Sequence, residues 1–345
     1  MISVLVVDDS PTARAMLRAI LQLEPEIEVV GEAINGREAV ELAKRLRPKV
    51  ITMDIQMPHM DGLEAIQEIM IETPTPIVVV TGSTRAGDVE ASLQALRAGA
   101  VSILRKPPGP ASPLHAKEAS RLVDTVRAMA SVMVVGRARR AIARRPPPPA
   151  PPGGTRAGVV AVAASTGGPA ALHRLLSELP ADFGAPILIV QHMTAGFIPG
   201  LVKWLAAASD LGVRVAAQGD RLEPRTVYVG PDDCHLGVST DGTIELSSAA
   251  PVGGFRPSAS FLFEAVARVF GRAALAVVLT GMGDDGVAGL RSVRAAGGRI
   301  IAQGEASSVI FGMPGAAVAA GLADRTVELG ELAAHLTTLT NGGTA

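Results

Sequence analysis

Acidic residues close two short apolar runs in the first half of the chain. Asp8 and Asp9 end the first run, Asp54 ends another, and Lys106 follows a third. Short apolar runs are typical of buried parallel strands, whose carboxyl ends meet in a ligand-binding crevice. Carboxylates gathered in one crevice repel each other, so they call for a hard cation such as Mg²⁺. With the lysine, they predict a site for a phosphoryl group built on one carboxylate.

Three polar residues in the second half also follow apolar runs. Ser165 precedes Gly167 and Gly168, His192 directly follows a later run, and Asp285 lies in the stretch 280–286 after another. Glycines let backbone approach a ligand, and a helix amino terminus favours an anion. The serine loop alone is compatible with phosphate binding or with a nucleophile. Together, the three residues suit a nucleophile, its general base and the carboxylate that orients the base.

Two competing interpretations of this half are possible. The stretch 281–286 fits G-x-G-x-x-G, with Glu305 about twenty residues on, which is typical of a dinucleotide site. Its two carboxylates would oppose a pyrophosphate, so the match is weak. His235, next to Cys234, is the rival general base. Neighbouring side chains on a strand point to opposite faces, which favours a structural role for His235.

Composition limits the function classes. The chain has 345 residues, enough for two domains, and a formal charge of −1 with only 3% aromatic residues. These values disfavour nucleic-acid binding. The single cysteine excludes an internal disulfide and fits a reducing compartment. No leader and no apolar stretch long enough to span a bilayer is found, so we expect a cytoplasmic protein without membrane insertion.

The elements that must position these residues alternate between strand and helix. In the first half, strands are expected at 3–8, 28–33, 49–54, 77–81 and 101–105, and helices at 12–22, 36–46, 62–72, 88–98 and 114–133. Ser112 and Pro113 are predicted to start the last of these helices. Five repeats predict a doubly wound, five-stranded parallel sheet.

A second α/β domain with a mainly parallel sheet is expected after an Arg- and Pro-rich linker. The domain borders are placed at 1–125, 126–156 for the helix end and linker, and 157–345. Strands are expected at 158–163, 186–191, 213–216, 226–229, 243–247, 274–280 and 298–302, and helices at 169–178, 198–209, 258–270, 286–296 and 314–321.

Residues 1–125 resemble a response-regulator receiver domain. The resemblance rests on Asp8-Asp9-Ser10, on Asp54 with Met57-Pro58 and Asp61-Gly62, on Val80-Thr81, and on Lys106-Pro107. It implies that Asp54 is the phosphoacceptor, that Thr81 is the switch hydroxyl and that Lys106 contacts the phosphoryl group. It implies an Mg²⁺ site formed by Asp8, Asp9, Asp54 and the carbonyl of Gln56. Ile103 and Gln56 depart from the usual pattern, and the first of these puts an aromatic switch in doubt.

Residues 157 to about 340 resemble the catalytic domain of chemotaxis protein-glutamate methylesterases. The resemblance rests on Ala164-Ser165-Thr166-Gly167-Gly168-Pro169, Gln191-His192-Met193, Arg256-Pro257-Ser258 and Thr280-Gly281-Met282-Gly283 with Asp285-Gly286. It implies a triad of Ser165, His192 and Asp285, with a second activity on receptor glutamines. Phe255 and Ser260 stand where the family usually has histidine and aspartate, which could alter substrate fit.

These inferences predict a phosphorylation-controlled ester hydrolase for chemoreceptors, with a histidine kinase of the CheA type as phosphodonor. Backbone N–H groups near Thr166 and Met282 are the candidate oxyanion donors. The ester chemistry itself is expected to use no cofactor. The receiver is expected to cover the esterase crevice until Asp54 is phosphorylated. The alternatives are a phosphorylation-dependent adaptor with a degenerate hydrolase domain and a dinucleotide-binding enzyme.

Overall fold

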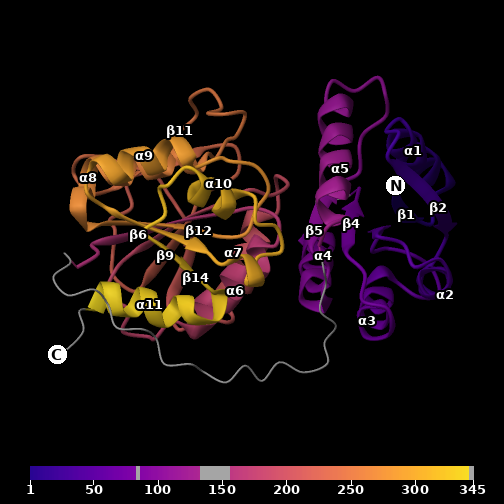
Figure 1. The fold of residues 1–345 in the computed structure, drawn as a ribbon, viewed down its shortest axis with the longest axis horizontal. Coiled ribbons are helices and arrows are strands. Elements are labelled where there is room, and N and C mark those ends of the chain that lie inside the picture. The colour runs from indigo at the N-terminus through magenta and orange to yellow at the C-terminus, as the bar shows by residue number, and fades with distance from the viewer. Residues whose placement is uncertain (83–85, 133–155, 342–345) are drawn as a thin grey trace. The chain divides into compact units, whose positions relative to one another are not determined.

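The computed structural model describes residues 1–82, 86–132 and 156–341, and it divides into two compact units (Figure 1). The units are Met1–Ala141 and Ile142–Ala345. The Arg- and Pro-rich core of the predicted linker, at 137–154, lies outside the described residues. The domain borders at 125 and 157 therefore stay predictions.

The first unit is an alternating α/β fold. Its elements are β1 Ile2–Val7, α1 Pro11–Gln22, β2 Ile27–Ala33, α2 Gly36–Leu46, β3 Val50–Met53, α3 Gly62–Glu72, β4 Ile77–Thr81, α4 Ala86–Ala98, β5 Ser102–Arg105 and α5 His115–Met129. The strands pair in parallel in the order β2-β1-β3-β4-β5. Helices α1 and α5 contact each other, as do α2 and α3, and α3 and α4. The predicted doubly wound sheet is confirmed.

Side-chain caps set the start of the first helices. The Ser10 hydroxyl accepts a hydrogen bond from the Ala13 N–H at 3.3 Å, and Asp61 accepts one from Glu64 at 2.9 Å. The prediction that α5 starts at Ser112-Pro113 is wrong, because the helix begins at His115. The Ser112 hydroxyl instead accepts the Leu114 N–H inside a preceding turn, at 3.3 Å.

The second unit is built on a larger parallel sheet. Its elements are β6 Val159–Ala164, α6 Gly168–Glu178, β7 Ile187–Gln191, α7 Ile198–Ala206, β8 Gly212–Val215, β9 Thr226–Val229, β10 His235–Val238, β11 Ile244–Ser247, α8 Ala259–Phe270, β12 Ala274–Val278, α9 Val287–Ala295, β13 Arg299–Gln303, α10 Met313–Ala319, β14 Arg325–Val327 and α11 Leu329–Asn341, with 3-10 turns at Gly271–Ala273 and Glu305–Ser307. A mainly parallel sheet is confirmed.

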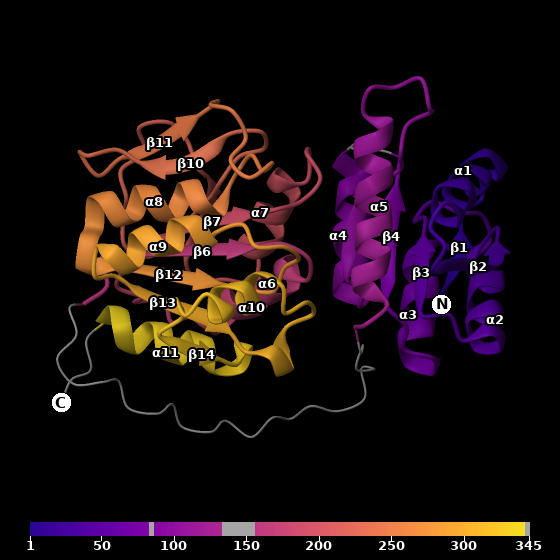
Figure 2. The same ribbon diagram turned by 45° about the horizontal axis from the view of Figure 1, so that its top comes forward.

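The strand order places β6 at the point where the winding reverses. Seven strands pair in parallel in the order β14-β13-β12-β6-β7-β9-β8, and β10 and β11 form a separate antiparallel hairpin. Figure 2 shows this hairpin beside α8, with α9 next to α8 and with α11 near α6. Ligands of such sheets bind at the carboxyl ends of the strands near the reversal. The ends of β6, β7 and β12 meet there.

Three elements were missing from the sequence-based assignment: β10, β14 and α11. The strands are short, and β10 contains Gly237, so neither has a long apolar run. Helix α11 does have a helical pattern, because Leu329, Leu332, Leu336 and Leu339 are spaced by three, four and three residues and all are buried. The sequence therefore does contain a signal for α11. No helix in the described part of the chain is long and apolar enough to span a membrane.

Candidate active site and phosphorylation site

Three carboxylates gather at the carboxyl ends of β1 and β3. One oxygen from each of Asp8, Asp9 and Asp54 lies within 4.8 Å of the others. Asp8 and Asp54 are buried, at 1% and 7% exposure, whereas Asp9 is exposed. This is the point where the strand order of the first sheet reverses. The predicted acidic cluster is therefore present.

Lys106 lies between two of these carboxylates. Its Nζ is 2.6 Å from Asp54 Oδ2 and 2.7 Å from Asp8 Oδ2. The other Asp54 oxygen accepts the Ile55 N–H at 2.8 Å. Burial raises the pKa of Asp54 above its ordinary value, and the contact with Lys106 opposes that shift. The ammonium thus stands where it can contact a phosphoryl group on Asp54.

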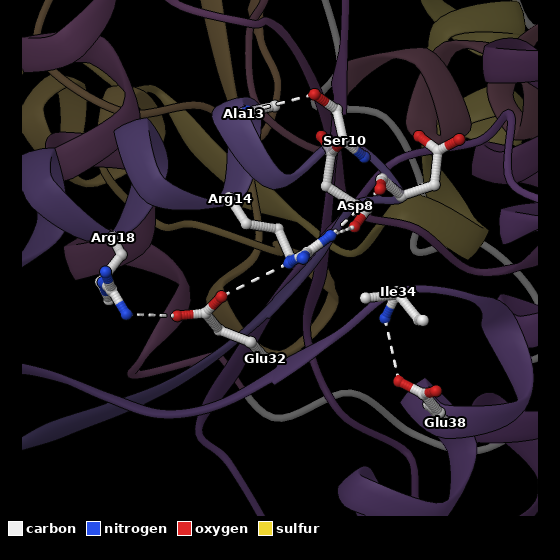
Figure 3. A network of polar contacts seen from close by, with 9 residues as sticks. Asp8, Ser10, Ala13, Arg14, Arg18, Glu32, Ile34 and Glu38 are labelled. Carbon is white, nitrogen blue, oxygen red and sulfur yellow. Dashed lines mark hydrogen bonds and ion pairs between the residues drawn. The ribbon is translucent and has the colours of Figure 1, made fainter.

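An arginine holds the backbone of the acidic loop. Arg14 Nη1 donates to the carbonyl oxygens of Asp8 at 2.7 Å and of Asp9 at 3.1 Å. Its Nε lies 3.4 Å from Glu32, which also pairs with Arg18 at 2.9 Å (Figure 3). No sequence pattern predicts this support, because it joins α1 to β2 only in the folded domain.

The cluster fits a divalent cation. Asp8 Oδ2 is buried and, apart from its ion pair with Lys106, accepts no hydrogen bond from the described residues. A set of carboxylate oxygens is the donor set that Mg²⁺ prefers. Thr81 is buried at the end of β4, and Ile103 is buried on β5. Gln56 is exposed, and its carbonyl as a fourth ligand stays a prediction.

Ser165 follows β6 and is tied to the strand that lies beside it. Its N–H donates to the Thr280 carbonyl at 3.1 Å, and the His192 N–H donates to the Ala164 carbonyl at 2.8 Å. A side chain at Gly281 would place its Cβ 2.7 Å from the Ser165 Cβ. Only glycine therefore lets the loop after β12 approach the serine. Three strand ends converge on this point, as the spacing predicted.

His192 and Asp285 are in contact. His192 Nε2 lies 3.0 Å from Asp285 Oδ2, and the two side chains are 8% and 3% exposed. The two atoms are close, although their alignment falls short of a well-formed hydrogen bond. The other ring nitrogen, Nδ1, is buried and has no hydrogen-bond partner in the described chain. No hydrogen bond joins it to Ser165 among those residues, but it is the nitrogen left to accept the serine proton.

The amino terminus of α8 holds the Asp285 carboxylate. The Ser258 hydroxyl donates to Oδ1 at 2.9 Å, the Ala259 N–H donates to Oδ2 at 2.7 Å, and the Ser260 N–H donates to Oδ1 at 3.1 Å. Burial alone would raise the pKa of Asp285. The contacts with His192 and with the two N–H groups outweigh burial and lower it from 3.8 to about 2. Asp285 therefore stays ionised beside the imidazole.

This lowered pKa predicts an acid-dependent loss of stability. A carboxylate whose pKa falls on folding stabilises the fold above its unfolded pKa, and that stability is lost as the pH falls toward about 2. Between about pH 5 and pH 2, wild type should lose about 2 kcal/mol more free energy of unfolding than Asp285→Asn. Trp204, the single tryptophan, reports unfolding of the second unit by fluorescence. If the free energy of unfolding changed with pH in the same way for both proteins, the lowered pKa of Asp285 would be contradicted.

Gln191 joins the backbones of two of the candidate catalytic residues. It is buried at the end of β7, and its Nε2 donates to the carbonyl oxygens of Ser165 and His192, both at 2.8 Å. Gln191 stands in the Gln191-His192-Met193 motif, but its bridging role was not predicted. An amide that ends a fully apolar strand was the available signal, since a buried amide requires hydrogen-bond partners.

His235 is held away from the triad. Its Nδ1 accepts the Ser258 N–H at 3.2 Å, and its Nε2 lies 3.1 Å from the Ala250 carbonyl. Both ring nitrogens are thus occupied on a fully buried side chain. Ser260 and Phe255, the two residues that depart from the pattern described above, both lie at this site. The Ser260 hydroxyl accepts the Gly286 N–H at 3.0 Å, and the Phe255 ring stacks on His192.

Comparisons with known proteins match both halves of the chain. The family model for the response regulator receiver domain matches residues 4–116, and the model for CheB methylesterase matches residues 160–336. A "Protein-glutamate methylesterase/protein-glutamine glutaminase 4" of Myxococcus xanthus is 56% identical over 98% of this chain and 97% of that protein. A similarly named protein of Anaeromyxobacter dehalogenans is 54% identical over 94% of this chain and 95% of its own length.

A solved structure resembles the second unit. The CheB methylesterase catalytic domain of Thermotoga maritima is 34% identical, with a TM-score of 0.52, and covers 54% of this chain and all of that one. The matched relatives span the receiver, the esterase domain and nearly all of the sequence between them. The chain therefore belongs to the CheB family, the response regulators with a protein-glutamate methylesterase domain.

Proposed function

We propose that this protein hydrolyses glutamyl methyl esters of chemoreceptors and deamidates receptor glutamines, under control of phosphorylation at Asp54. The contact between His192 and Asp285, at the strand ends where Ser165 also lies, is the observation that carries the proposal. An adaptor would not need an ionised carboxylate held by three donors beside an imidazole. No observation favours a dinucleotide site.

In the proposed mechanism Ser165 is the nucleophile, His192 is the general base, and Asp285 holds the His192 tautomer and stabilises its imidazolium. His192 Nδ1 takes the proton of the Ser165 hydroxyl as its oxygen attacks the ester carbonyl. The imidazolium then returns the proton to the methoxy group, and methanol leaves. Water, deprotonated by the same imidazole, cleaves the acyl-enzyme to give glutamate and free Ser165. A glutamine substrate follows the same path and releases ammonia.

Two backbone N–H groups are available for the oxyanion. The Thr166 and Met282 N–H groups donate to no protein acceptor among the described residues. They flank Ser165 and Gly281, which lie in close contact. Donors aimed at the developing oxyanion are the largest stabilising contribution in acyl transfer. We therefore keep both as the oxyanion donors.

Control is assigned to the receiver. Asp8, Asp9 and Asp54 would hold Mg²⁺, with the Gln56 carbonyl as a further ligand. The cation would neutralise the crowded carboxylates and orient a phosphoryl group toward Asp54. Lys106 contacts that group, and the Thr81 hydroxyl is the switch. The phosphodonor is a histidine kinase of the CheA type, and the protein acts in the cytoplasm.

Mass spectrometry of receptor peptides tests the proposal. Incubation of methylated receptors with the protein, Mg²⁺ and a phosphodonor should remove methyl groups and convert specific glutamines to glutamates. An unchanged receptor, with Asp54 phosphorylated and the protein bound to the receptor, would instead establish the adaptor.

Replacing Asp54 by asparagine should separate control from catalysis. The amide forms no acyl phosphate and is a weaker ligand for Mg²⁺. Basal hydrolysis should be unchanged, while stimulation by a small phosphodonor should disappear. Methanol release is measured with and without the phosphodonor for both proteins. Equal stimulation of both would remove Asp54 from the control of activity.

A fragment that begins at Arg156 should hydrolyse esters without regulation. Arg156 donates to the Thr340 carbonyl, and the Ala157 N–H donates to Leu339 at 3.0 Å, so both residues belong to the second unit. If the unphosphorylated receiver inhibits, the fragment should be faster than the resting full-length protein. The gain is about tenfold if the closed state is favoured over the open state by about 1.4 kcal/mol. The measurement is the turnover of the fragment and of the full-length protein at equal active-site concentration. A folded fragment slower than the resting protein would contradict inhibition.

A further inference from the structure

The ring of Phe255 lies flat against the imidazole of His192. The two ring centroids are 4.4 Å apart, and the planes are inclined by 10°. The His192 side chain is 8% exposed. The aromatic ring therefore covers one face of the imidazole.

Phe255 lies in a second, very short hairpin, residues 252–255, which holds it in this position. Val252 and Phe255 exchange two backbone hydrogen bonds of 3.0 Å. Between them, Gly253 and Gly254 have φ values of 59° and 87°. Positive φ at both central residues is the signature of a type I′ turn, which two glycines adopt without strain. The tip of the hairpin is thus a defined turn.

Arg256 fixes the base of the same hairpin. Its guanidinium donates twice to Asp233 Oδ1, at 2.9 and 2.7 Å, and its Nη1 donates to the carbonyl oxygens of Ser248 and Ala249 at 3.0 and 3.1 Å. These four hydrogen bonds, two of them to one oxygen of Asp233, hold the guanidinium in place. The backbone of Phe255 is therefore fixed on both sides, by the turn before it and by Arg256 after it.

One continuous segment then contacts both the base and its orienting carboxylate. Phe255 covers the His192 ring, while Ser258, Ala259 and Ser260 donate to Asp285. The Asp285 contact fixes only Nε2, so the imidazole could still tilt about that atom. Contact with a flat ring restricts that tilt, and hence the direction of Nδ1.

We propose that Phe255 is a positioning residue that holds the His192 imidazole in the plane where Nδ1 can take the Ser165 proton. The inference rests on the proposed function for the identity of the base and the nucleophile. The electronegative face of the phenyl ring also suits the positive charge that the imidazole carries after it accepts the proton. A branched aliphatic side chain would fill the space but would present no flat face.

Three variants test the role in the full-length protein. Phe255→Leu should lower kcat for receptor demethylation by about tenfold to a hundredfold, because small misplacements of a base are costly. KM should change by less than about twofold, and Phe255→Tyr should restore kcat to within about twofold of wild type. The matched control is Val252→Ala, in the same hairpin, where the side chain is 37% exposed and only its backbone pairs with Phe255. Val252→Ala should behave as wild type.

Labelling with a fluorophosphonate supplies a measurement that needs no receptor. The Ser165 oxygen forms a bond to phosphorus, fluoride leaves, and His192 takes the serine proton. Phe255→Leu should be labelled about tenfold or more slowly than wild type, and Phe255→Tyr at nearly the wild-type rate. Circular dichroism establishes that each variant is folded.

The outcomes separate the two proposals. If the wild-type protein is labelled at Ser165 but leaves receptors unchanged, the proposed function is overturned. The labelling rates of the variants would still test the role of Phe255. Active wild type with equal kcat and labelling rate in Phe255→Leu would overturn the positioning role. A loss confined to KM would also overturn it, and would make Phe255 a substrate contact. The positioning role would also be overturned if Phe255→Tyr were as slow as Phe255→Leu.

Discussion

Ser165→Ala should lose at least about a thousandfold in turnover on methylated receptors while it keeps its fold and its receiver chemistry. Alanine removes the only oxygen at this position that can form an acyl-enzyme. The Ser165 N–H donates to Thr280, and Gln191 donates to the Ser165 carbonyl, both through the backbone. These contacts survive the substitution, so the loop should keep its shape.

The control for Ser165→Ala is phosphorylation of the same protein. Its receiver should take up a phosphoryl group from a small phosphodonor at the wild-type rate, and its circular dichroism spectrum should match wild type. Turnover within about tenfold of wild type would remove Ser165 from the mechanism. A variant that also fails in phosphorylation would indicate a folding defect instead.

His192→Ala should resemble the serine variant, because the base and the nucleophile act as a unit. The substitution removes Nδ1 as the proton acceptor and leaves Asp285 without its partner at 3.0 Å. Activity should fall by about a thousandfold or more in kcat. Initial rates of receptor demethylation under saturating substrate provide the measurement.

His235 provides the contrasting variant. His235→Asn keeps an oxygen that can accept the Ser258 N–H, so the start of α8 and its contacts with Asp285 should persist. We expect this protein to retain activity to within about tenfold, together with a lower free energy of unfolding, because a fully buried ring is replaced by a smaller group. An active His192→Ala protein beside an inactive, folded His235→Asn protein would mean that the base is His235.

Local patterns were sufficient for the residues at the strand ends. Ser165, His192, Asp54 and Lys106 each follow a short apolar run that forms a buried parallel strand. In a parallel sheet, the carboxyl ends of neighbouring strands meet, so such residues converge wherever the strand order reverses. The sequence therefore predicted both groups of converging strand ends and the fold class.

Contacts between distant segments were not predictable in this way. Phe255 reaches His192 only because Arg256 and a two-glycine turn fix the hairpin, and Arg14 supports Asp8 only because α1 lies beside β2. Neither contact follows a local period. The start of α5 differs from the prediction for another, local reason, because Ser112 and Pro113 form a turn just before the helix.

The most direct test of the account is methanol release from methylated receptors by wild type and Ser165→Ala, each with and without phosphodonor and Mg²⁺. The account predicts release by wild type, faster release once Asp54 is phosphorylated, and none above background from Ser165→Ala under either condition. Methanol release by folded Ser165→Ala at the wild-type rate would contradict it, as would a wild-type protein that is phosphorylated and releases none.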